Sequence, residues 1–169
     1  MIDYRTATPA DGPALAAMAK RCFTDTFGSL YRASDLSAFL DRAFGADGLP
    51  SQLDDPAFTI QLALEDDRII GFIKLGPVDF PGEWDAGTIE LCQLYVLGAW
   101  QGAGVAAQLM DWAIAEARAQ GYDALVLSVY TDNHRARRFY ERYDFVDIGP
   151  YQFLVGDHVD EDRLMRRAL

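Results

Sequence analysis

The stretch 88–121 constrains the fold more than any other part of the chain. Residues 89–96 are rich in β-branched, aromatic and aliphatic side chains, which is typical of a buried strand. Val105 and Leu109 then begin an apolar pattern at helical spacing that runs to Gly121, a residue type that commonly ends a helix. The sequence therefore predicts a strand, a glycine-bearing turn and a helix in immediate succession.

The turn between this strand and this helix has the sequence QGAGVA. The first N–H groups of a helix have no internal partner and lie at the positive end of the helix dipole, so several of them can bind one phosphate. Glycine also removes the Cβ atoms that would keep a ligand away from the backbone. A phosphorylated ligand is therefore predicted here, and a turn that serves only tight strand-to-helix packing is the alternative. The predicted site consists of Gln101, Gly102, Ala103, Gly104, Val105 and Ala106.

Length and composition narrow the class of protein. The 169 residues are half apolar, which suits one domain over residues 1–169 and excludes a disordered chain. No apolar run reaches the length of about 18 residues that a membrane span needs, and the first residues do not resemble a secretory signal. We therefore expect a cytoplasmic protein with no membrane partner.

The charged, cysteine and histidine residues argue against a nucleic-acid-binding protein and against a metalloprotein. With 26 acidic and 15 basic side chains, the formal charge of −11 repels nucleic acid and favours a cationic substrate. Solubility alone is an alternative reason for this charge. The two cysteines and two histidines show no metal-ligand spacing, so we expect neither a zinc site nor another metal site.

The remaining segments predict a mixed α/β fold, with helices covering a central sheet. Segment 24–33 is expected to be a loop in which Phe27 and Tyr31 either line a substrate entrance or cover the core. Further strands are predicted at 2–7, on both sides of a turn at 65–68, and at 124–130, 145–155 and 162–169. Further helices are predicted from residue 9 to about residue 23, and at 35–45 and 134–143.

Two motifs resemble those of the GNAT superfamily of acetyl-CoA-dependent N-acetyltransferases. The superfamily's Arg/Gln-x-x-Gly-x-Gly/Ala pyrophosphate loop is matched by Gln101, Gly104 and Ala106. Its Asn-x-x-Ala-x-x-Phe-Tyr element is matched, within NHRARRFYERYDF, by Asn133, Ala136, Phe139 and Tyr140. Two motifs at the expected separation are more specific than either motif alone, and the order of strands and helices also agrees.

One position departs from the superfamily pattern. Asp144 stands where glycine usually precedes the phenylalanine, which puts the turn before Phe145 in question. Within the superfamily, the WQG turn, the FTDTFGSLY region and the tail FLVGDHVDEDRLM resemble PaiA-type enzymes, which acetylate polyamines.

The resemblance implies a mostly antiparallel sheet of about seven strands, splayed at the central strand and flanked by about four helices. It also implies acetyl-CoA as the acetyl donor and a primary amine, with a polyamine as the leading guess, as the acceptor that attacks the thioester directly. A splayed strand frees its backbone groups for a ligand. The cofactor contacts expected outside the glycine turn are Leu94, Tyr95, Val96, Asn133, Ala136 and Tyr140.

Glu90 and Tyr140 are the predicted catalytic residues. An alkyl amine is mostly protonated at neutral pH, so its attack needs a base, and Glu90 is expected to act directly or through water. Strand alternation places Glu90 on the same face as Val96 unless a bulge changes the register. The resemblance implies that Tyr140 protonates the departing thiolate, and the N–H of Val96 is predicted to bind the oxyanion. A surface salt bridge for Glu90 and core packing for Tyr140 are the alternatives.

Two groups of charged residues have candidate binding roles. The basic group Arg135, Arg137 and Arg138 either meets the cofactor's terminal phosphate or forms a solvated helix face. Trp84 is flanked by acids that could hold an ammonium beside its ring or could be loop charges that aid solubility. The residues predicted near the acceptor are Phe27, Tyr31, Trp84 and Glu90.

Three other functions are weighed against amine acetylation. GAGVAA also satisfies the Gly-x-Gly-x-x-Ala of dinucleotide-binding oxidoreductases, but LGAWQ separates it from its strand, and Asp123 precedes the next strand instead of ending it. A non-catalytic acetyl-CoA sensor would need neither Glu90 nor Tyr140. A toxin that acetylates charged tRNA would need a basic surface. The sequence leaves the acceptor amine undecided, and it leaves a homodimer open.

Overall fold

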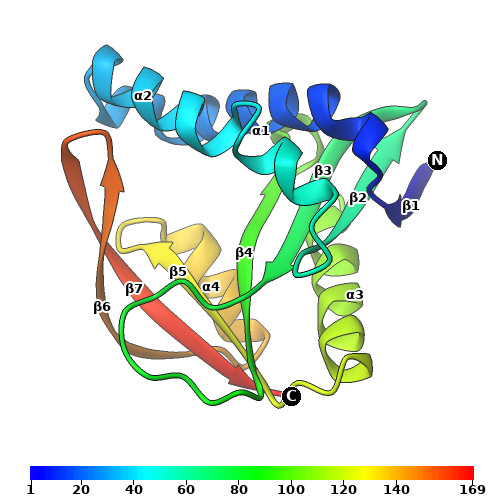
Figure 1. Cartoon of the computed structure of the whole chain (residues 1–169), viewed down its shortest axis with the longest axis vertical. Helices are drawn as coiled ribbons and strands as arrows, with labels where there is room; N and C mark the ends of the chain where they lie inside the picture. The colour runs from blue at the N-terminus through cyan, green and yellow to red at the C-terminus, as the bar shows by residue number, and fades with distance from the viewer.

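Seven strands form one sheet in the computed structural model, which describes residues 1–169 (Figure 1). Their spatial order is β1-β2-β3-β4-β5-β7-β6, and every neighbouring pair is antiparallel except β4 and β5. The predicted mixed, mostly antiparallel sheet is confirmed. The strands are β1 (Ile2–Thr6), β2 (Thr59–Glu65), β3 (Arg68–Gly76), β4 (Thr88–Val96), β5 (Ala124–Tyr130), β6 (Val146–Val155) and β7 (His158–Ala168).

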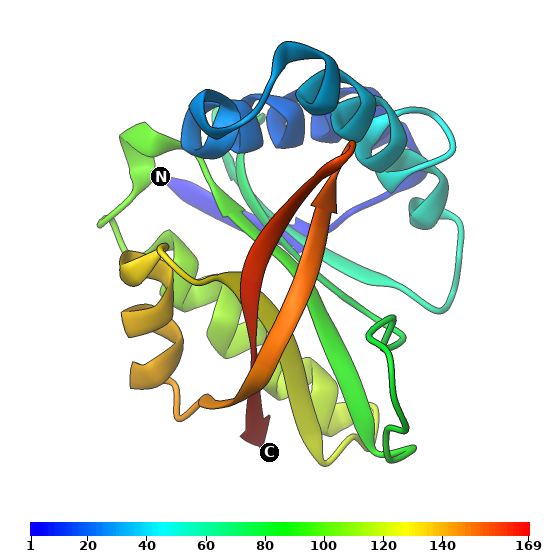
Figure 2. The same cartoon turned by 90° about the vertical axis from the view of Figure 1, so that its left-hand side faces the viewer.

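Four α-helices cover the two faces of this sheet (Figures 1 and 2). They are α1 (Gly12–Phe27) and α2 (Ala33–Phe44) on one face, and α3 (Val105–Ala119) and α4 (His134–Arg142) on the other. Each helix buries an apolar stripe, so two hydrophobic clusters form, one containing Leu15 and Phe23 and the other containing Leu109. No helix is long and apolar enough to cross a membrane.

The central strands β4 and β5 separate along most of their length. They pair only where Thr88, Ile89 and Glu90 lie opposite the first three residues of β5. Beyond this point β4 stays paired with β3 and β5 stays paired with β7, so the two strands diverge (Figure 1). The predicted splay at the central strand is confirmed.

A bulge in β4 changes which side chains share a face. Strand β3 pairs with Gln93 and then with Leu91, so Cys92 has no residue opposite it. Leu91 packs in the same cluster as Val96 although the two are an odd number of positions apart. Glu90 and Val96 therefore lie on opposite faces, and the simple alternation predicted for this strand is wrong.

Helix α1 is longer than the sequence suggested. It continues to Phe27, and a short 3-10 turn (Gly28–Leu30) follows, so most of the predicted loop is helical. Thr24, Asp25 and Thr26 are weak helix formers, so the local sequence favours a loop here. The ring of Phe27 packs 5.1 Å from that of Phe23, one turn earlier in the same helix, and 6.2 Å from that of Tyr130 on β5. Both contacts favour the additional helical turn.

The turn between β2 and β3 is tighter than predicted. Glu65 and Arg68 still pair with each other, so only Asp66 and Asp67 form the turn. These two residues have φ values of 49° and 62°. Positive φ at both positions is the two-residue hairpin geometry whose twist matches that of the strands, and aspartate tolerates it better than most residues.

Candidate active site

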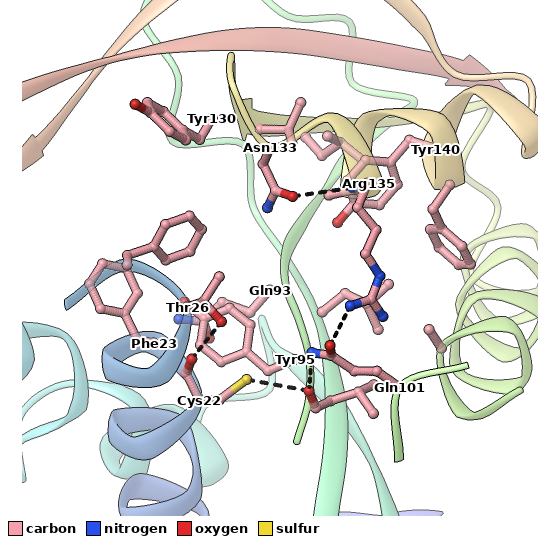
Figure 3. Close-up of a pocket in the computed structure, with 18 of the residues that line it drawn as sticks. Cys22, Phe23, Thr26, Gln93, Tyr95, Gln101, Tyr130, Asn133, Arg135 and Tyr140 are labelled. Atoms are coloured by element: carbon pink, nitrogen blue, oxygen red, sulfur yellow. Dashed lines mark hydrogen bonds between the residues drawn. The ribbon is translucent and has the colours of Figure 1, made fainter. Parts of the chain in front are cut away.

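The divergence of β4 and β5 opens a cavity of about 770 Å³ (Figure 3). Its walls come from the two strands, the glycine turn, α4, the end of α1 and β7. The predicted cofactor residues that line it are Leu94, Tyr95, Val96, Gln101, Gly102, Gly104, Ala106, Asn133, Ala136 and Tyr140. Ala103 and Val105 do not line it, and the side chain of Val105 is buried in the core.

The glycine turn presents free backbone amides at the start of α3. Gly102 and Gly104 have φ values of 85° and 84°, in the left-handed region that glycine favours. The N–H groups of Gly102, Gly104, Val105 and Ala106 donate to no backbone carbonyl. A Cβ at either glycine would meet no atom within 4 Å, so it is the backbone conformation and not crowding that calls for glycine. These free amides fit a pyrophosphate group.

Arg135 adds positive charge at the same end of the cavity. Its guanidinium donates to Oε1 of Gln101, and Nε2 of Gln101 donates to the carbonyl of Val96 at 3.0 Å (Figure 3). These bonds tie the start of α4 to the glycine turn and to β4. Of the three arginines in the predicted basic group, only Arg135 lines the cavity, and Arg137 instead approaches Asp147 at 3.7 Å.

The free edge of β4 directs backbone groups into the cavity. The N–H of Leu97 donates to Ile70 of β3, whereas the carbonyl of Val96 accepts from side chains, the amide of Gln101 and the thiol of Cys22. In an antiparallel pair, successive residues alternate in facing their N–H and C=O groups toward the partner strand or away from it. Val96 and Leu94 therefore face the diverged side, where an extended ligand can bind as an added strand would.

Helix α4 contributes the opposite wall. Asn133 caps this helix, because its Oδ1 accepts the N–H of Ala136 at 3.2 Å (Figure 3). Tyr140 also reaches the cavity and packs against Phe145, with ring centroids 5.7 Å apart. Burial raises the pKa of Tyr140 to about 12. Its hydroxyl therefore stays protonated at neutral pH and can donate a proton or a hydrogen bond.

The turn after α4 keeps its geometry despite the departure at Asp144. Asp144 has a φ of 62°, in the left-handed region that glycine would occupy easily and that aspartate enters more readily than most residues. The N–H of Phe145 then bonds to the carbonyl of Tyr140 at 3.1 Å. Phe145 is thereby placed in the core, as the motif requires.

The end of the cavity remote from the glycine turn is acidic. Figure 3 shows Tyr130 of this end across the open space from Gln101. Strand β7 begins before the predicted boundary at 162, and its alternation places Asp160 and Asp162 on one face. Both carboxylates line the cavity, and each residue is 6% exposed. Sequence reasoning missed them, although two acids at alternate positions of an extended segment were a signal for a shared face.

The two acids differ in their partners. Asp160 accepts a hydrogen bond from the hydroxyl of Tyr31 and lies 3.1 Å from Nε2 of His158. Asp162 forms no salt bridge. Burial raises the pKa of Asp162 to about 7, against a smaller lowering by the hydroxyl of Ser128. A positively charged ligand that binds next to a buried carboxylate without a cationic partner would offset the cost of burying its charge.

Phe27 and Tyr31 lie between the cavity and the core. Both line the cavity, and both also pack against the hydrophobic cluster beneath α1 and α2. The ring of Phe27 meets that of Tyr130 at 6.2 Å, edge to face. These aromatic side chains therefore form part of the wall of the acidic end.

Glu90 and Trp84 lie outside the cavity wall. The carboxylate of Glu90 accepts the N–H of Asp79 at 2.9 Å and so holds loop 77–87 against β4. Burial raises the pKa of Glu90. Trp84 donates its indole N–H to the carbonyl of Phe80 at 3.1 Å, within that loop. Glu90 could reach a ligand in the cavity only through water, and Trp84 does not reach it in this conformation.

Comparison with known proteins identifies the family. Residues 14–145 match the model of the Acetyltransferase (GNAT) family. An uncharacterized N-acetyltransferase of Mycobacterium tuberculosis is 32% identical over 159 residues, which cover 94% of this chain and 98% of that protein. An aminoalkylphosphonate N-acetyltransferase of Salmonella typhimurium is 33% identical over 103 residues, which cover 61% of this chain and 66% of that protein.

Solved structures share the fold over the whole chain. The PaiA N-acetyltransferase from Thermoplasma acidophilum, crystallised in complex with coenzyme A, has a TM-score of 0.81 and 18% identity, with 100% of this chain and 99% of that chain covered. A probable acetyltransferase from Staphylococcus epidermidis has a TM-score of 0.78 and 16% identity, with 99% of each chain covered. The chain therefore belongs to the GNAT family and is an acetyl-CoA-dependent N-acetyltransferase.

Proposed function

We propose that this enzyme acetylates a primary amine that carries positive charge, with polyamines such as spermidine as the leading acceptors. The observation that carries the proposal is the polarity of the cavity. The free amides of the glycine turn and Arg135 lie at one end, and Asp160 and Asp162 lie at the other. No lysine lines the cavity, and both of its arginines belong to α4. An ammonium group fits the acidic end because it would supply the cation that Asp162 lacks.

Different residues bind acetyl-CoA, stabilise the oxyanion and protonate the leaving group. Acetyl-CoA supplies the acetyl thioester. The amides of the glycine turn hold its pyrophosphate, and the free edge of β4 aligns its extended arm. The N–H of Val96 stabilises the oxyanion that forms when the amine attacks. Tyr140, kept neutral by a pKa of about 12, donates its proton to the departing sulfur.

Glu90 is the base predicted from the sequence. It would act through water, because its carboxylate lies outside the cavity wall and is bonded to Asp79. The raised pKa of this carboxylate, caused by burial, makes it a stronger base than an exposed glutamate.

Relatives support an amine acceptor and suggest a second acceptor class. The name of the Salmonella relative describes a substrate with both an amine and an anionic phosphonate. The acidic end of the cavity disfavours such an anionic tail, because Asp160 and Asp162 would repel it. A cationic tail is therefore the better match.

The selectivity for charge is tested by comparing kcat/KM for spermidine, butylamine and aminoethylphosphonate. We expect spermidine to exceed the other two by about tenfold or more, which corresponds to about 1.4 kcal/mol. Part of this advantage should fall with added salt, because ions screen the attraction over a Debye length of about 8 Å at physiological ionic strength. Equal values for the three amines, at low and at high salt, would contradict the proposed acceptor.

A further inference from the structure

We propose that Asp162 is the general base of the acetyl transfer, and that its carboxylate takes the proton from the ammonium group of the acceptor. The inference rests on the proposed function and adds to it the residue that makes the amine nucleophilic.

The sheet places Asp162 at the side of the opening between β4 and β5. Tyr130 lies opposite Asp162 in the pairing of β5 with β7, and Tyr151 lies opposite it in the pairing of β6 with β7. Residues directly opposite each other in a ladder share a face, so these three side chains lie on one side of the sheet. Tyr130 and Asp162 line the same cavity as Val96 and Tyr140. The proposed base, oxyanion donor and acid therefore border one space.

The hydrogen bonds distinguish Asp162 from its neighbour. Asp160 already has Tyr31 and His158 as partners, which suits it to a structural or orienting role. Asp162 has no cationic partner, and burial opposes its charged form. A bound ammonium would stabilise that charged form and then lose its proton to it. A pKa of about 7 suits a base that works near neutral pH.

No lysine or arginine competes for this carboxylate. Arg163, the next residue on β7, instead bonds to Asp147 at 2.8 Å. Burial raises the pKa of Tyr151, and the charges of Glu90, Asp79 and Asp162 add to the rise, so this ring lies near both candidate bases. The ionisable groups next to Asp162 are Asp160 of β7 with its partner His158, Tyr130 of β5, Tyr151 of β6 and Tyr31 after α1. Glu90 of β4 and Asp79 act on Tyr151 and so come next in this set.

Glu90 is less suited to direct proton transfer. A base must come within about 2.6–3.2 Å of the proton's heavy atom, or reach it through one water. Glu90 is absent from the cavity wall, and one of its oxygens is bonded to the N–H of Asp79. Its position fits a residue that holds loop 77–87 in place.

Protons balance over one turnover. Asp162 takes one proton from the ammonium group, and the neutral nitrogen attacks the thioester carbon to form the C–N bond. The C–S bond then breaks, and Tyr140 gives its proton to the sulfur. The nitrogen loses a second proton as the amide forms, which restores Tyr140 through solvent. Asp162 releases its own proton to solvent, so the net products are an acetylated amine, coenzyme A and one proton.

The test measures kcat/KM for the wild type and for Asp162→Asn, Glu161→Gln and Glu90→Gln, with spermidine and acetyl-CoA as substrates. The measurements run from about pH 5.5 to about pH 9, on both sides of neutrality. Glu161 is the exposed neighbour on the other face of β7 and serves as the matched control. We expect kcat/KM of the wild type to rise with pH through about 7, as Asp162 loses its proton. Asp162→Asn should lower kcat/KM by about 100-fold and remove this rise. Glu161→Gln should match the wild type, and Glu90→Gln should lose less than about tenfold.

Folding of the variant is checked through its affinity for acetyl-CoA and its melting temperature. The pKa of Asp162 is raised to about 7 in the folded protein, from about 3.9 in an unfolded chain. A raised pKa means that its contribution to stability is present at low pH and is lost as pH rises through about 7. Asp162→Asn should bind acetyl-CoA normally. It should also gain stability relative to the wild type as pH rises from about 3.9 to about 7, because the wild type loses stability over this range.

The outcomes separate the inference from the proposed function. An active wild type together with an Asp162→Asn variant that keeps its rate and its pH profile would overturn the assignment of Asp162 alone. A large loss in Glu90→Gln with a small loss in Asp162→Asn would also overturn it and return the role to Glu90. Failure of the wild type to acetylate any amine would overturn both.

Discussion

Gly104→Val is expected to abolish the rise in melting temperature that acetyl-CoA gives the wild-type protein. Valine strongly disfavours the φ of 84° at this position, so the turn must rearrange. The amides of residues 104–106 would then no longer converge on one phosphate. A ligand at 100 times its Kd stabilises a fold by about 2.7 kcal/mol, so the loss is readily measured by thermal unfolding.

Gly121→Val is the matched control for this variant. Gly121 lies just beyond the other end of α3, has a φ of 86° and, like Gly104, has no atom within 4 Å of an added Cβ. Both variants should lose about 1–2 kcal/mol of stability from the left-handed backbone alone. Only Gly104→Val should lose the response to acetyl-CoA. If Gly104→Val shows the full shift in melting temperature, the phosphates bind elsewhere.

Tyr140→Phe is expected to lower kcat by about 100-fold while leaving the affinity for acetyl-CoA within about threefold of the wild-type value. The variant keeps the buried ring but removes the only proton that Tyr140 can donate. Because the pKa of Tyr140 is about 12, its hydroxyl stays protonated from about pH 6 to about pH 9, and the loss of kcat should be similar throughout this range. Steady-state kinetics and a binding titration separate the two quantities.

Tyr143→Phe controls for the loss of a hydroxyl near the end of α4. The hydroxyl of Tyr143 bonds to Asp111 at 3.0 Å and to the carbonyl of Ala107 at 3.2 Å, and Tyr143 does not line the cavity. This variant should lose about 1 kcal/mol of stability and keep its kcat. Equal kcat values for Tyr140→Phe and Tyr143→Phe would remove Tyr140 from proton transfer.

The glycine-turn end of the cavity could be predicted from local sequence patterns. The apolar composition of β4, the two glycines and the helical spacing of α3 are neighbours in sequence, so this strand, turn and helix follow from short-range rules. Asn133 and Tyr140 likewise belong to one short helix. The structure brings these segments together around the divergence of β4 and β5, as the resemblance implied.

The acidic end of the cavity depends on contacts between segments that are distant in sequence. Asp160 and Asp162 are buried because β7 inserts between β5 and β6, and the pattern of β7 alone does not show this. The bulge that turns Glu90 away from the face of Val96 arises in the pairing of β4 with β3. The additional turn of α1 brings Phe27 to the cavity, where its ring meets that of Tyr130 on β5. Sequence reasoning therefore identified the residues that line the glycine-turn end of the cavity better than those that line its acidic end.

Mass spectrometry of the products formed from deuterium-labelled acetyl-CoA and spermidine tests the central claim most directly. The account predicts that the label appears on an amine nitrogen of spermidine, with one coenzyme A released for each acetylated amine. It also predicts that the label is absent from spermidine when the Gly104→Val protein is used. Labelled acetate without acetylated spermidine, or acetyl-CoA that binds but is never consumed, would contradict the account.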